Sequence, residues 1–219
     1  MADFAIDRVI SLLREAVQPL PKAAMFELAE RGYQSPFQQL VACILSIRTY
    51  DEVSLPAAER LLSVAETPEE MAKLTPEQID RLIQDCTYHE SKCHQIWQIA
   101  AQIIKEYDGK LPCDEGVMRS FKGVGPKCAH LALGIACGQP WISVDVHVHR
   151  VTNRWGYVQA RTPEKTLIAL EAILPRQYWV EINQLLVPFG KHVCMGTLPK
   201  CSTCPIATDC QRVGVVKHR

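Results

Sequence analysis

Four cysteines late in the chain have the residue type and spacing of a metal centre. They are Cys194, Cys201, Cys204 and Cys210, separated by six, two and five residues. Four thiolates can hold either a tetrahedral zinc ion or a cubane [4Fe–4S] cluster. Structural zinc usually uses two close cysteine pairs, whereas this segment has one such pair, Cys201 and Cys204. The spacing therefore favours iron–sulfur and leaves zinc as the alternative.

The other six cysteines are scattered through segments with helical periodicity. Since the N-terminal residues lack the long apolar centre of a signal peptide, disulfides are not expected. A buried thiol packs as a small hydrophobic side chain. We therefore predict six unbridged cysteines inside the helical core, namely Cys43, Cys86, Cys93, Cys113, Cys128 and Cys137.

A glycine-rich turn in the middle of the chain could bind phosphate and present a nucleophile. Gly123-Val124-Gly125 is followed by Pro126, which favours the first position of a helix. The glycines permit positive φ angles and a close backbone approach, and the amides that begin the helix suit an anion such as a DNA phosphate. Lys127 falls in the first helical turn, where the helix dipole disfavours the ammonium and so helps to supply the neutral amine of a nucleophile. A solvated surface lysine is the alternative.

An acidic residue, Asp145, precedes the next helical segment. It is a candidate for stabilising positive charge or accepting a proton, and its alternative role is that of a helix N-cap. His147 and His149 follow it without a third residue at a metal-binding spacing. We therefore expect these two histidines on a helix surface or facing DNA.

Helix-start signals position all these residues. Three hydroxyl residues, Ser35, Thr67 and Thr75, are each followed by a proline and then by a Glu or Gln at the third helical position. This pattern is a capping box. Thr162 is followed by a proline in the same way. No segment of comparable strength alternates with period two, so the fold class is all-α. The expected helices cover residues 4–17, 36–47, 52–63, 68–73, 76–84, 90–107, 115–121, 126–137, 146–155, 163–173 and 178–192.

The composition allows a substantial core and makes a membrane protein improbable. The chain has 219 residues, 47% of them hydrophobic, but no apolar run of the ~18 residues that span a bilayer. The net charge is zero, yet residues 1–110 carry 11 Lys and Arg against 17 Asp and Glu, and residues 111–219 carry 13 against 7. A basic second half is compatible with a polyanionic partner on one side of the molecule.

Together and in this order, the motifs resemble the endonuclease III family of helix-hairpin-helix DNA glycosylases. Residues 121–132 are similar to the hairpin and catalytic lysine of that family, and residues 144–154 to its catalytic aspartate segment. Residues 174–190 look like its approach to the cysteines, whose spacing is that of the family's [4Fe–4S] cluster. The likeness extends from about residue 35 to residue 210.

The resemblance implies two helical lobes. The first is a six-helix barrel domain, residues 29–139, which contains the helix-hairpin-helix motif. The second is a helical domain in which residues 1–28 join residues 140–219 and the C-terminal [4Fe–4S] cluster loop. The cofactor implied is one [4Fe–4S] cluster held by the four late cysteines.

The activity implied is that of a bifunctional DNA glycosylase and AP lyase of base excision repair that removes oxidised pyrimidines. The damaged nucleotide must leave the base stack to be reached. Lys127 would attack C1′ of the sugar and form a Schiff base while Asp145 assists. β-Elimination then cleaves the strand 3′ to the lesion. The partner implied is double-stranded DNA that contains damaged bases or abasic sites.

Further DNA contacts follow from the resemblance. Arg48 stands where the family has a Gln that reaches the base opposite the lesion, with a phosphate contact as the alternative. Tyr88 matches the residue that fills the gap left by the flipped base, with a core tyrosine as the alternative. The remaining predicted DNA-binding residues are Gly123, Gly125, Lys191 and Lys200.

Other functions remain open at this stage. A mismatch thymine or uracil glycosylase of the same superfamily resembles a family with Tyr at the position of Lys127. An adenine glycosylase generally lacks that lysine and has an extra domain. A non-catalytic helix-hairpin-helix protein that binds damaged DNA is the third possibility. We expect a monomeric, cytoplasmic, nucleoid-associated protein of a prokaryote, with no membrane partner.

Overall fold

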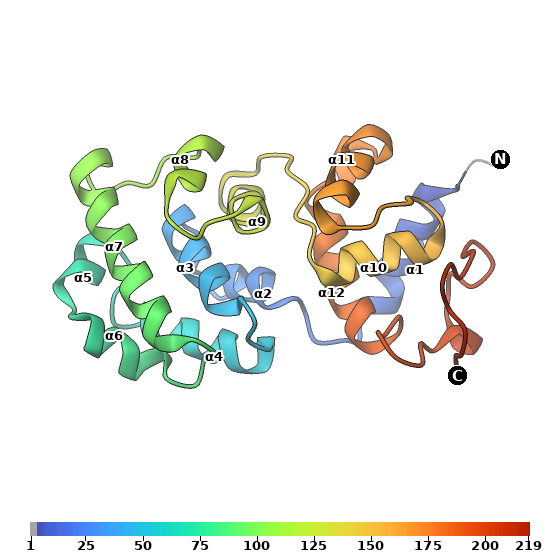
Figure 1. The fold of residues 1–219 in the computed structure, drawn as a ribbon, viewed down its shortest axis with the longest axis horizontal. Coiled ribbons are helices and arrows are strands. Elements are labelled where there is room, and N and C mark those ends of the chain that lie inside the picture. Colours follow the sequence, from blue (N-terminus) through green and yellow to red (C-terminus); the bar gives the residue numbers. More distant parts are fainter. Residues whose placement is uncertain (1–3) are drawn as a thin grey trace. The chain divides into compact units, whose positions relative to one another are not determined.

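The computed structural model describes residues 4–219, and these residues form helices and loops without any strand (Figure 1). The all-α prediction is confirmed. The helices are α1 (Ile6–Val17), α2 (Ala24–Glu30), α3 (Pro36–Ser46), α4 (Asp51–Leu62), α5 (Pro68–Lys73), α6 (Pro76–Ile83), α7 (His89–Tyr107), α8 (Glu115–Ser120), α9 (Pro126–Cys137), α10 (Val146–Trp155), α11 (Pro163–Ile173) and α12 (Glu181–His192). Two short 3-10 helices, η1 (Arg176–Tyr178) and η2 (Cys201–Thr203), complete the set in the described part of the chain.

The capping signals form as the sequence predicts. Ser35, Thr67 and Thr75 each accept a hydrogen bond from the backbone at the third helical position, whose side chain bonds back to the cap backbone. Thr162 caps α11 through the backbone N–H of Lys165. Each cap satisfies an N–H group that has no partner within the helix, so these starts agree with the expected positions.

Two elements differ from the expected helices. Helix α2 was not predicted, because no capping residue followed by proline precedes it. It is stabilised instead by Met25 and Leu28, which are buried in the core. The expected helix over residues 178–192 is divided into η1 and the later-starting α12. Tertiary packing decides both cases, and local sequence signals do not report it.

The chain divides into two compact units. Unit 1 consists of Met1–Ala23 and Ile142–Arg219, and unit 2 consists of Ala24–Trp141. Each has its own hydrophobic core. The domain limits that the resemblance implies, residues 29–139, begin five residues after the start of unit 2 and end two residues before its end.

Helix α3 organises unit 2. Leu40 and Ile44 are fully buried, and α3 packs against α2, α4, α7 and α9. Two of these neighbours carry predicted site residues at their starts, since Tyr88 precedes α7 and Lys127 lies in α9. Helix α3 is therefore the common support for both.

Helix α10 organises unit 1. Val148, Val151 and Trp155 bury one face of it, and it packs mainly against α12, which in turn packs against α1. Asp145 is the residue before α10, so its position is fixed by the core of unit 1. None of the helices described in either unit combines the length and the hydropathy of a membrane-spanning segment.

Cys113 and Cys137 form a disulfide, so the prediction that all six scattered cysteines are unbridged is wrong for this pair. The two residues are 24 positions apart, and α9 brings Cys137 back beside the loop before α8, with the Cα atoms 6.0 Å apart. Sequence spacing could not reveal this return. Within residues 4–219 the other four, Cys43, Cys86, Cys93 and Cys128, are buried and unbridged as expected.

Replacing Cys113 and Cys137 together by serine should lower the free energy of unfolding by about 3 kcal/mol. The cross-link restricts the unfolded chain over a loop of 24 residues, and its removal restores that entropy. Urea denaturation followed by circular dichroism, in buffer without reductant, measures the change. Adding a reductant should bring the wild type to the variant's value and leave the variant unaffected. Rapid alkylation of both thiols in native, unreduced wild-type protein would contradict the assignment.

Candidate active site and cysteine pocket

Residues 121–125 connect α8 to α9 in a tight turn. Phe121 is buried, and its carbonyl accepts a hydrogen bond of 3.1 Å from the Val124 backbone N–H. Gly123 has a φ angle of +82°, and a Cβ atom there would lie 2.7 Å from Nε2 of Gln95. That amide donates to the Lys122 carbonyl at 2.8 Å. Both the backbone angle and the crowding therefore favour glycine at position 123.

Gly125 serves the turn differently. Its φ angle is −95°, which any residue can adopt, and a Cβ atom there would meet nothing within 4 Å. Of the two properties that glycine permits here, Gly123 uses the positive φ angle and Gly125 leaves room for a close backbone approach. The fold leaves open space at this position, where α9 begins with N–H groups that have no partner within the helix. An anion can approach this backbone closely.

Lys127 is half-buried in the first turn of α9. Its Nζ lies 3.9 Å from Sγ of Cys43 on α3, and that sulfur lies 2.7 Å from Sγ of Cys128. The hydrogen bond with Cys43, followed by burial, raises the pKa of the Cys128 thiol well above its ordinary value. On the side facing α3, the amine of Lys127 thus lies near the sulfur of Cys43, one member of a buried thiol pair. The solvated-lysine alternative does not describe this environment.

Asp145 is the N-cap of α10, as its alternative interpretation predicted. Its Oδ1 accepts hydrogen bonds from the backbone N–H groups of His147 (2.9 Å) and Val148 (2.8 Å). Both bonds end on the same oxygen, so the cap orients the carboxylate without using Oδ2. Capping and a catalytic role are therefore compatible in this residue. Lys127 belongs to unit 2, whereas Asp145 belongs to unit 1.

The histidines after Asp145 make hydrogen bonds inside unit 1. His149 Nδ1 lies 2.7 Å from Oγ1 of Thr166 on α11, and His147 Nδ1 lies 3.0 Å from Nη2 of Arg150. Both histidines are half-buried. Both side chains are thus partly covered on the surface of α10, because α11 and α12 pack against this helix, and the expectation that they face DNA stays a prediction.

Two arginines of α10 hold the loop that begins at Cys194. Arg150 Nε donates to the Cys194 carbonyl at 3.2 Å, and Arg154 Nη1 donates to the Met195 carbonyl at 2.6 Å. Arg154 Nη1 also lies 3.5 Å from Sγ of Cys194. The helix that begins at Asp145 therefore also fixes the first of the four late cysteines.

The four late cysteines line one pocket in unit 1, together with apolar side chains that include Trp155, Phe189 and Ile206. No three His, Cys, Asp or Glu side chains within residues 4–219 are close enough to hold a single metal ion. The thiols surround a common space and do not converge on one point. Four cysteine thiols that line one pocket can hold either a [4Fe–4S] cluster or a tetrahedral zinc ion.

Two further observations concern the chemistry of this pocket. Trp155 is 1% exposed, and its indole N–H has no hydrogen-bond partner in the described part of the chain. A buried donor without an acceptor costs free energy, and cluster or cysteine sulfur is a suitable acceptor. Burial raises the pKa of the Cys204 thiol to about 11, whereas a bound metal would favour its thiolate. The donors present therefore suit an iron–sulfur cluster.

Arg48 and Tyr88 lie on exposed loops of unit 2. Tyr88 is 56% exposed, so the alternative of a core tyrosine is wrong. Their φ angles are +54° and +59°, in the left-handed region that disfavours residues with a Cβ atom. Such strain persists where the surrounding structure enforces it and is frequent at binding sites. Among the predicted phosphate contacts, Lys200 is exposed and Lys191 is half-buried.

Sequence reasoning missed Lys92, which is 4% exposed. The signal was present, because Lys92 falls at the helical spacing of Ile96, Ile99 and Ile103 on the buried face of α7. A charged residue on an apolar face requires specific partners.

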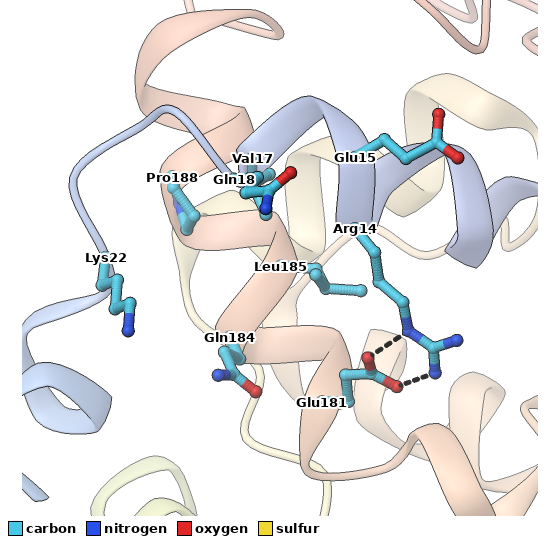
Figure 2. A pocket seen from close by; sticks show the side chains of 9 residues that line it. All are labelled: Arg14, Glu15, Val17, Gln18, Lys22, Glu181, Gln184, Leu185 and Pro188. Carbon is cyan, nitrogen blue, oxygen red and sulfur yellow. Dashed lines mark hydrogen bonds and ion pairs between the residues drawn. The ribbon is translucent and has the colours of Figure 1, made fainter. Parts of the chain in front are cut away.

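Figure 2 shows a separate pocket of about 440 Å³ in unit 1, between α1, α12 and the segment after α1. Arg14 donates two hydrogen bonds, of 2.6 and 2.8 Å, to the carboxylate of Glu181 at one end of it. None of the residues that the sequence predicted for catalysis, DNA binding or metal binding lines this pocket. It therefore has no part in the site assembled here.

Comparisons with known proteins agree with this description. The family described as HhH-GPD superfamily base excision DNA repair protein matches residues 41–176. Endonuclease III of Thermotoga maritima is 34% identical over 200 residues, which cover 91% of each chain. Mouse endonuclease III-like protein 1 is 37% identical over 77% of this chain and 57% of its own length. A solved structure of a trapped endonuclease III–DNA covalent intermediate shares the fold, with a TM-score of 0.83, 24% identity and 97% coverage of both chains.

Proposed function

The chain belongs to the HhH-GPD superfamily of base excision DNA repair proteins, and from this membership we propose that it is a bifunctional DNA glycosylase and AP lyase acting on oxidised pyrimidines. The observation that carries the proposal is Lys127, held half-buried in the first turn of α9 directly after the hairpin. A lysine amine is the nucleophile that a combined glycosylase and lyase reaction needs. The names of the endonuclease III relatives support the same activity.

The reaction follows from an amine at this position. The neutral Nζ of Lys127 attacks C1′ of the flipped nucleotide, the bond from C1′ to the base breaks, and the base leaves with the bonding electrons and takes up a proton. Loss of the amine protons and opening of the sugar ring give the imine between Nζ and C1′. Removal of a proton from C2′ then expels the 3′ phosphate, which cleaves the strand 3′ to the lesion.

Asp145 is proposed to assist these steps. Its carboxylate stabilises positive charge that develops at the sugar and helps to deprotonate the lysine. The two backbone hydrogen bonds to Oδ1 hold its orientation, which reduces the reorganisation needed during the reaction.

DNA binding is proposed to use both units. The open backbone at Gly125, in the turn that Gly123 shapes, suits one phosphate, and Lys191 and Lys200 in unit 1 suit others. Unit 1 carries 13 Lys and Arg against 8 Asp and Glu, so the basic surplus of the chain resides there. We expect the protein to act as a monomer on double-stranded DNA that contains damaged bases or abasic sites.

The alternatives have less support. A thymine or uracil mismatch glycosylase of the superfamily would have Tyr where this chain has Lys127. A protein that only binds damaged DNA needs neither the lysine nor the oriented carboxylate of Asp145. One assay separates the three: duplexes containing thymine glycol, 5-hydroxycytosine, dihydrouracil, a G·T mismatch, uracil or an abasic site, tested for base release and for nicking. Base release without nicking, or neither product, would refute the bifunctional activity.

We propose that Cys194, Cys201, Cys204 and Cys210 hold a [4Fe–4S] cluster, supported by the single pocket they line and by their spacing. When bound, the cluster supplies folding free energy and fixes the loop that carries Lys200, and no step of the reaction passes through it. Arg150 and Arg154 would support that loop through the bonds described above.

Protein purified without oxygen should be yellow-brown and contain about four iron and four sulfide per chain. Cys201→Ser should lose most of the iron, because a ligand is missing. Cys86→Ala, which changes a buried thiol outside the pocket, should retain it. Iron and zinc analysis of the three proteins is the measurement. Stoichiometric zinc in the wild type would show that the pocket binds the alternative metal.

A further inference from the structure

Lys92 reaches from the first turn of α7 to the loop after α3. Its Nζ donates to the carbonyls of Leu45 and Ile47, both at 2.8 Å, and to Oγ1 of Thr49 at 3.1 Å. These bonds use all three N–H donors of the ammonium. Two of the acceptors lie at the C-terminal end of α3, where the helix dipole favours a cation. A 4% exposed lysine is thereby fully bonded.

Thr49 connects this lysine to a second loop. Its Oγ1 also accepts a hydrogen bond of 3.2 Å from the backbone N–H of Thr87, and its own hydroxyl points to the Ile47 carbonyl at 3.4 Å. The hydroxyl thus uses its one donor and two acceptor sites. Residues 47–49 and 87 are joined through a single side-chain oxygen, although 38 positions separate Thr49 from Thr87.

Each joined residue is the immediate neighbour of a strained, exposed one. Arg48 precedes Thr49, Tyr88 follows Thr87, and both have positive φ angles. The Tyr88 carbonyl is also held by the backbone N–H groups of Ser91 and Lys92. Residues with positive φ angles keep this strained conformation only when surrounding contacts enforce it. The hydrogen bonds of Thr49 and Lys92 supply such contacts.

From these contacts we propose that Thr49 and Lys92 are positioning residues that hold Arg48 and Tyr88 as one rigid DNA-reading element. The proposal rests on the proposed function, in which Tyr88 fills the gap left by the flipped nucleotide and Arg48 reads the base opposite it. The gap and the opposite base belong to the same base pair. The side chains that contact them, Tyr88 and Arg48, must therefore keep a fixed separation. If the two loops are already held together in the free protein, less conformational entropy is lost when they are ordered on DNA.

Thr49→Val tests the proposal, because valine keeps the shape and branching of threonine and removes the hydroxyl. Thr49→Ser keeps the hydroxyl and is the matched control. The ligand is a duplex with a tetrahydrofuran abasic analogue opposite each of the four bases in turn. Thr49→Val should bind it about tenfold more weakly, as expected for a lost hydrogen-bonded connection. Its preference among opposite bases should shrink towards equality, while Thr49→Ser should match the wild type.

A double-mutant comparison separates positioning from general stability. If Thr49 acts through Arg48 and Tyr88, adding Thr49→Val to an Arg48→Ala, Tyr88→Ala background should weaken binding no further. A further tenfold loss there would overturn the proposal, as would wild-type binding by Thr49→Val or an equal loss in Thr49→Ser. Lys92→Met should reproduce Thr49→Val if it folds.

Hydrogen exchange of the DNA-free protein tests the connection independently of the proposed function. The peptide covering residues 86–91 should exchange faster in Thr49→Val than in the wild type or Thr49→Ser, because the Thr87 amide loses its acceptor. Unchanged exchange would refute the connection itself. Failure of the wild type to prefer abasic-analogue over undamaged duplex would instead refute the proposed function.

Discussion

Borohydride should trap no covalent complex between Lys127→Ala and duplex DNA with an abasic site, whereas the wild type should be trapped efficiently. Reduction fixes only an imine, and the substitution removes the amine that forms it. Base release and strand cleavage should fall to background. The measurement is a gel shift that survives denaturation, with radiolabelled DNA and saturating protein.

Lys122→Ala is the matched control, because Lys122 is an exposed lysine of the same hairpin whose backbone carbonyl, not its amine, bonds to Gln95. It should be trapped like the wild type. Lys127→Ala should bind a tetrahydrofuran duplex within about threefold of the wild type, since phosphate contacts supply most of the affinity. Trapping that persists in Lys127→Ala would assign the nucleophile to another residue.

Asp145→Asn should release damaged bases about 10²–10³-fold more slowly than the wild type, as expected when a preorganised charge at the reacting centre is lost. The fold should persist, because the amide oxygen of Asn can accept the same two backbone hydrogen bonds as Oδ1 of Asp145. Single-turnover base release and the melting temperature should be measured together.

Asp114→Asn provides a matched cap substitution away from the reaction. Asp114 caps α8 by accepting a hydrogen bond of 2.8 Å from Val117 N–H, and it should tolerate Asn with activity unchanged. If Asp145→Asn behaves like Asp114→Asn in both assays, Asp145 is a cap and nothing more.

Local signals predicted the parts of the fold that local physics determines. The helix starts at Ser35, Thr67 and Thr75 depend on bonds that span three residues, so the sequence alone locates them. Helix α2 has no such bond at its start and depends on burial of Met25 and Leu28, which involves distant residues. The same reasoning explains why the Cys113–Cys137 disulfide was missed: only the return of α9 brings the two together.

The candidate site shows the same division. Lys127 and Asp145 could be predicted as candidates because each lies at a local motif, Lys127 directly after a hairpin and Asp145 at the N-cap of a helix. Thr49 and Lys92 carry no motif, since their importance comes from contacts between loops far apart in the sequence. The hydrogen bond between His149 and Thr166 was not anticipated for the same reason, because Thr166 lies on α11, outside the helix of His149.

The two-segment make-up of unit 1 has a consequence for synthesis on the ribosome. Unit 2 is continuous, so its core can close as soon as residue 141 has emerged, whereas α1 packs against α12 and must wait for it. At about 5–20 residues per second, the interval between α1 and the end of α12 lasts roughly 10–35 s. During that time the apolar side chains of Val9, Ile10 and Leu13 have no native partners. Until α12 has been made, the nascent chain therefore offers chaperones the amphipathic helix α1.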